Sequence, residues 1–97
     1  MQLHDLISYS RGGVMSKVLF KTERLNVTLF SMAEGTQISE HTATREGLVH
    51  IIEGEGFFTL EGRQIPIRGG VIFHMSAGAP HSISVSKDTS FLLVLAS

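Results

Sequence analysis

The chain has 97 residues, a net charge of −1 and no cysteine, with 42% hydrophobic and 18% charged residues. This length fits one domain with a single modest core, and the composition excludes a disordered tail. The near-zero charge gives no basic face for nucleic acid, and the lack of cysteine excludes disulfides, thiolate zinc sites and a thiol nucleophile.

Short β-type segments separated by glycine turns run along the whole chain, and none shows sustained helical periodicity. In chain order, the expected strands span residues 7–10, 14–21, 25–32, 48–52, 57–60, 65–67, 71–75, 81–85 and 91–95. The first of these is weak, and Pro66 places its own strand at a sheet edge or strand end. Many short strands at regular spacing predict an all-β barrel or jelly roll, since closure removes exposed sheet edges.

The N-terminus shows no secretory signal, because no basic stretch precedes an apolar one. The longest apolar run, residues 91–96, is far shorter than the roughly 20 residues that a membrane span requires. We therefore expect a cytoplasmic protein that binds neither membrane nor nucleic acid.

Histidine is the residue type most suited to chemistry here, as a metal ligand or a general base. The five histidines are His4, His41, His50, His74 and His81. Two of them lie beside glycine turns, in the segments 35–41 and 78–81. His41 and His81 are therefore the first candidates for a site.

The spacing around these two histidines resembles the motifs of the cupin superfamily. In the first motif, Gly35 is followed after five residues by His41, and Gly54 stands at the far end. In the second, Gly70 and Gly78 precede His81. The resemblance covers about residues 25–96. It implies a single cupin domain over residues 1–97, with a small β-barrel and a pocket at one end.

The resemblance also implies where a metal would bind. Family ligands fall at two histidines and a glutamate of the first motif and at the histidine of the second. His41 and His81 occupy two of these positions, whereas Ala43 and Gly47 stand at the other two. A complete set would bind Fe, Mn, Ni or Zn, but two imidazoles alone bind such metals weakly.

Strand alternation suggests which other residues share the face of His41, because side chains of equal parity point the same way. It places Ala43, Arg45 and Gly47 on that face as pocket-lining residues, and it points His50 outward. Arg45 is either an anion anchor or a solvated loop residue. His74 is the candidate third ligand or a pocket-lining residue, with a structural role as the alternative.

Two functions remain open at this point. The first is a pocket that binds a small molecule, with or without a weakly held divalent metal on His41 and His81. The second is a metal-dependent enzyme of dioxygenase or isomerase type with an unknown substrate, so whether the protein is an enzyme stays undecided. The resemblance further implies a homodimer, and the runs 48–52 and 91–95, apolar on both faces, favour it.

Overall fold

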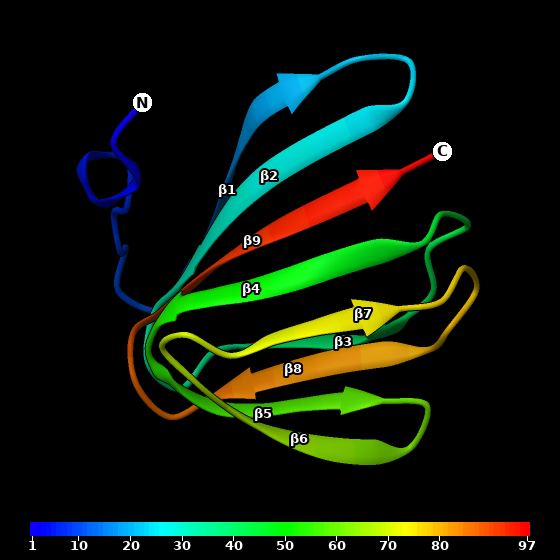
Figure 1. The fold of residues 1–97 in the computed structure, drawn as a ribbon. Coiled ribbons are helices and arrows are strands. Elements are labelled where there is room, and N and C mark those ends of the chain that lie inside the picture. Colours follow the sequence, from blue (N-terminus) through cyan, green and yellow to red (C-terminus); the bar gives the residue numbers. More distant parts are fainter.

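A computed structural model describes residues 1–97 as two antiparallel β-sheets that face each other (Figure 1). The elements are η1 (Leu3–Asp5), β1 (Val14–Lys21), β2 (Leu25–Met32), β3 (Gln37–His41), β4 (Gly47–Glu53), β5 (Glu55–Leu60), β6 (Arg63–Arg68), β7 (Ile72–Met75), β8 (His81–Val85) and β9 (Thr89–Ala96). The all-β prediction is confirmed, and three strands, β1, β2 and β8, have the predicted bounds.

The larger sheet has the strand order β1-β2-β9-β4-β7, and the smaller has the order β3-β8-β5-β6. The two sheets meet at one end and splay apart at the other, as in a partly open jelly roll (Figure 1). The strand that contains Pro66, β6, is an edge strand, as predicted from its missing N–H group.

The core fills the space between the inner faces of the two sheets. Its buried residues are Met32, Val49, Ile51, Met75 and Phe91 from the larger sheet, and Phe58, Ile67, Ile83 and Val85 from the smaller. Val49 and Ile51 are fully buried, whereas His50 between them is exposed. The predicted alternation along β4 is therefore confirmed.

The N-terminal segment, residues 1–13, packs on the outer face of the larger sheet instead of joining it. The ammonium Nζ of Lys17 in β1 donates to the Leu6 carbonyl at 3.1 Å, and the Tyr9 hydroxyl donates to Glu53 Oε2 at 2.8 Å. The predicted strand at residues 7–10 is wrong, because these residues form no strand and no neighbouring strand pairs with them. No helix in the structure combines the length and apolar character needed to cross a membrane.

Candidate functional site

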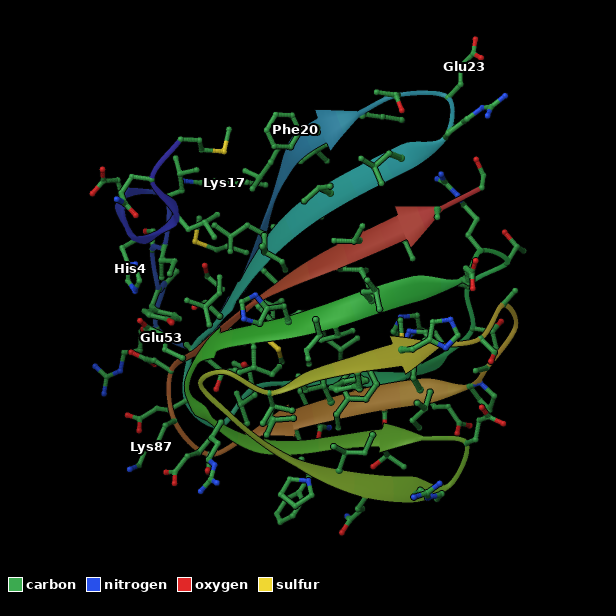
Figure 2. All side chains as sticks on the ribbon, viewed as in Figure 1. His4, Lys17, Phe20, Glu23, Glu53 and Lys87 are labelled. Atoms are coloured by element: carbon green, nitrogen blue, oxygen red, sulfur yellow. The ribbon has the colours of Figure 1, made fainter.

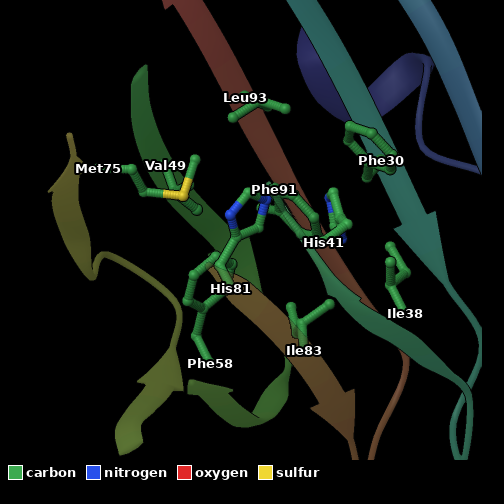
Figure 3. A pocket seen from close by; sticks show the side chains of 10 residues that line it. All are labelled: Phe30, Ile38, His41, Val49, Phe58, Met75, His81, Ile83, Phe91 and Leu93. Carbon is green, nitrogen blue, oxygen red and sulfur yellow. The ribbon is translucent and has the colours of Figure 1, made fainter. Parts of the chain in front are cut away.

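A pocket opens between the two sheets and is lined mainly by apolar side chains (Figure 3). Its ten lining residues are Phe30, Ile38, His41, Val49, Phe58, Met75, His81, Ile83, Phe91 and Leu93. The cavity volume is about 90 Å³, well below the roughly 300–1,000 Å³ of sites for drug-sized ligands. The pocket therefore fits a very small molecule or one end of a larger one.

The pairing of β3 with β8 brings the two candidate histidines together. His41 lies opposite His81, and Ile38 lies opposite Ile83. Two intervening residues of β3, Ser39 and Glu40, thus match the single intervening residue of β8, Ser82, and this bulge lets both Ile38 and His41 face the pocket. Without the extra residue, strict alternation would turn His41 away whenever Ile38 points inward.

Both imidazole rings are held by backbone carbonyl groups close in sequence. Nδ1 of His41 is 2.8 Å from the Ser39 oxygen, and Nδ1 of His81 is 2.9 Å from the Ala79 oxygen. A carbonyl oxygen only accepts hydrogen bonds, so each Nδ1 carries the proton. In the neutral rings, each Nε2 therefore keeps a free lone pair.

The two rings lie against each other at the pocket, with His81 deeper than His41 (Figure 3). Their centroids are 4.1 Å apart with an interplanar angle of 62°. His81 also stacks on Phe58, with centroids 5.8 Å apart and rings nearly parallel. His81 is only 6% exposed, whereas His41 is exposed at the mouth.

The donor set does not fit a resident metal ion. Metal-binding histidines usually donate their second ring N–H to a carbonyl or carboxylate, and His41 and His81 have this arrangement. However, no cluster of three or more His, Cys, Asp or Glu side chains exists in the chain. The protein supplies two nitrogen donors, fewer than the three or four protein ligands of a typical catalytic or structural site.

His74 lies outside the pocket, on the other face of β7 from Met75. Its Nε2 is 2.9 Å from Glu46 Oε2, and the two side chains are 54% and 61% exposed. This placement corrects the expectation that His74 lines the pocket or reaches a metal there. Its neighbour Met75 takes the inward position because residues alternate along the strand.

Ala43, Arg45 and Gly47 are not among the lining residues. Ala43 and Arg45 belong to the loop between β3 and β4, two strands in different sheets, so alternation does not carry across it. The guanidinium Nε of Arg45 donates to the Ala96 carbonyl at 3.3 Å. Gly47 faces inward, but a Cβ there would lie 2.9 Å from Leu95 Cδ2, so this space is already filled.

Sequence reasoning missed the aromatic part of the pocket. Phe30, Phe58 and Phe91 read as core residues in apolar runs, and they are packed in the core as well as lining the cavity. Their alternation within β2, β5 and β9 fixes the inward direction. It cannot show that the packing leaves a space between them.

The shifted pKa values belong to groups outside the pocket, at the end where the sheets meet; Glu53 and Lys87 are labelled there in Figure 2. Burial raises the pKa of Tyr9 to about 12, the Ser90 hydroxyl opposes this rise and the Glu53 carboxylate adds to it. A 2.8 Å ion pair with Lys87 lowers the pKa of Glu55, and Glu55 raises the pKa of Lys87. These groups are not part of the candidate site.

Comparison with known proteins places this architecture among the cupins. The model of the Cupin domain family matches residues 28–96. A cupin superfamily protein from Desulfitobacterium hafniense is similar in structure with a TM-score of 0.92, 25% identity and coverage of 99% of this chain and 88% of the other.

Two further solved structures are similar. A Cupin 2 conserved barrel domain protein from Leptotrichia buccalis has a TM-score of 0.93 and 26% identity over 100% of this chain and 47% of the other. A conserved protein of unknown function from Streptococcus pyogenes has a TM-score of 0.90 and 24% identity over 99% of this chain and 84% of the other. No curated protein shows significant similarity to the sequence.

Proposed function

This chain belongs to the cupin domain family, and we propose that it binds a small organic molecule in the pocket lined by His41 and His81. The observation that carries the proposal is the pocket itself: eight apolar side chains surround two imidazoles whose Nδ1 atoms are already bonded. Apolar walls with a few fixed polar groups are the usual construction of a small-molecule site. Family membership alone names no ligand, because one fold serves many functions.

The alternative, a metal-dependent enzyme of dioxygenase or isomerase type, has less support. Such an enzyme needs a firmly held metal with open positions. The chain offers two imidazole donors, and the position that the family resemblance gives to a glutamate is Gly47, packed against Leu95. We therefore favour binding over metal-dependent catalysis.

Chemical shifts of the isotope-labelled protein, recorded while small organic compounds are added, test the proposal. A ligand in the pocket should move the signals of lining residues such as Ile38 and Phe58, and leave those of the outward-facing His50 unchanged. Shifts confined to the outer face of the sheet would contradict it.

A matched pair of variants makes this test sharper. Leu93 lines the pocket, whereas its neighbour Leu92 lies on the other face of β9, opposite His50. Leu93→Phe adds volume to the pocket wall and should weaken binding, while Leu92→Phe should not. Equal effects of the two substitutions would argue against binding in this pocket.

A weakly held divalent metal, Zn, Mn, Ni or Fe, on His41 and His81 is a second candidate. The carbonyl partners of both Nδ1 atoms favour it, since they leave the Nε2 atoms of two adjacent rings free. A metal bound there would raise the melting temperature by mass action. His41→Ala should abolish that rise, and His74→Ala should leave it unchanged; the reverse result would assign the metal to the outer pair of His74 and Glu46.

A further inference from the structure

We infer that the pocket selects an uncharged molecule, or an uncharged end of a larger one, no larger than about one ring, that carries a single hydrogen-bond donor such as a hydroxyl group. This inference rests on the proposed function and names the chemical class of the ligand. It follows from three properties of the pocket: its polar groups, its charge and its size.

The polar side chains of the pocket can accept hydrogen bonds but have no proton to offer. The Nδ1 proton of each histidine is used by a backbone carbonyl, on Ser39 for His41 and on Ala79 for His81. The remaining eight lining side chains are apolar. A ligand without a donor would leave the Nε2 of the buried His81 unpaired, whereas a ligand with a donor satisfies it.

No charged side chain lines the pocket, although the chain has eight cationic and nine acidic residues. Arg45, the cation expected near the mouth, instead donates to the Ala96 carbonyl. A carboxylate ligand would lose its hydration, meet no cation and face two lone pairs. A cationic ligand would lose its hydration without a neutralising carboxylate, so both kinds of ion are disfavoured.

The size and the walls of the pocket favour a small ring. The cavity of about 90 Å³ is smaller than the roughly 150 Å³ apolar cavity that accommodates benzene, but it is open on one side. Phe30, Phe58 and Phe91 supply aromatic surface inside. Because the cavity is open on one side, a ring can lie partly among these side chains and partly at the mouth, where His41 is exposed.

Three probes of similar size separate these features: phenol, toluene and benzoate. At mildly alkaline pH, ordinary imidazoles are neutral and benzoate is an anion. We expect phenol to bind roughly three- to tenfold more tightly than toluene, which corresponds to the net contribution of one hydrogen bond. Benzoate should bind most weakly of the three.

The variant His81→Phe tests the role of the buried imidazole, and His50→Phe on the outer face is its control. A phenylalanine ring at position 81 can still stack on Phe58, as the imidazole of His81 does, and thermal unfolding checks that the variant is folded. His81→Phe should reduce the preference for phenol over toluene while toluene still binds. His50→Phe should keep the preference of the parent protein.

The outcomes separate the inference from the proposed function. If toluene or benzoate binds as tightly as phenol, the pocket is a binding site but the inferred ligand class is wrong. The same conclusion follows if a folded His81→Phe variant keeps the full preference for phenol. If none of the probes shifts a pocket signal while other small compounds do, the inference alone fails; if no compound does, the proposed function fails as well.

Discussion

Tyr9 ties the N-terminal segment to the sheet through one hydrogen bond to Glu53. It is the only tyrosine, and the chain has no tryptophan, so the phenolate absorbance reports this one side chain. Burial raises the pKa of Tyr9 from 10.0 to about 12. A raised pKa means that the folded state holds the proton more tightly than the unfolded state.

We predict that Tyr9 makes the protein less stable as the pH rises from about 10 to about 12. The contribution of Tyr9 to stability is fully present below pH 10, where both states keep the proton. It is lost between pH 10 and about 12, because the phenol of the unfolded state ionises there while that of the folded state keeps its proton until its own pKa is reached. Tyr9→Phe should remove this part of the alkaline loss, measured by urea unfolding at several pH values. A phenolate titration of the folded protein centred on the ordinary tyrosine value would contradict the prediction.

At the scale of single residues, the motif spacing predicts that His41 and His81 share one site. In the structure the ring centroids of His41 and His81 are 4.1 Å apart. The structure also shows contacts that spacing cannot reveal. The bond of each Nδ1 to a carbonyl depends on local backbone shape, and the partner of His74, Glu46, is 28 residues away in the sequence.

At the scale of strands, glycine positions and alternation predict the elements where the pattern is regular. The bounds of β1 and β2 follow from clear alternation, and Pro66 correctly marks an edge strand. The predictions from side-chain alternation are wrong where the backbone is irregular. The bulge in β3 changes the parity of His41 relative to Ile38, and the loop at residues 42–46 joins two different sheets.

The contact between β5 and β8 depends on the absence of a side chain at Gly56. A Cβ at this position would overlap the Ser84 carbonyl oxygen and lie 2.8 Å from the Val85 Cα. These are backbone atoms of the paired strand, since Gly56 lies opposite Val85. The two strands cannot move apart without breaking their hydrogen-bonded ladder.

We predict that Gly56→Ala lowers the free energy of unfolding by about 2–4 kcal/mol, because the clash must be relieved by backbone movement. Gly62→Ala is the control: it has open space around the new Cβ, but its φ of +79° favours glycine. That substitution should cost only about 1 kcal/mol. Urea unfolding measures both, and a smaller loss for Gly56→Ala than for Gly62→Ala would contradict the prediction.

At the scale of the whole molecule, the larger sheet extends beyond the smaller one. β1 forms the free edge of the larger sheet, and Figure 1 shows the β1–β2 hairpin standing away from the opposite sheet. None of the eight residues of β1 is buried. Val18 is 60% exposed on one face and Phe20 is 53% exposed on the other, because a bulge lies between them.

This exposure refines the reason for expecting a homodimer. Four of the nine exposed large apolar side chains belong to β1, more than to any other strand. They are Val14, Met15, Val18 and Phe20, and the other five are Met1, Leu25, Leu48, Phe57 and Ile72. An edge strand with apolar side chains on both faces is prone to associate with another chain. Lys17 and Phe20 both project to the side of the N-terminal segment (Figure 2). The charge of Lys17 therefore opposes association with another chain along only part of this edge.

We predict that the protein forms a two-fold homodimer with β1 in its interface. Light scattering at micromolar concentration should give twice the 10.6 kDa mass of one chain. The double change Val18→Lys and Phe20→Lys should give a folded monomer, because it puts charge on both faces of the strand without touching the core. Gln64→Lys, at an exposed position of β6 in the other sheet, should leave the dimer intact. A monomeric parent protein would rule out the dimer, and a double variant that stays dimeric would move the interface away from β1.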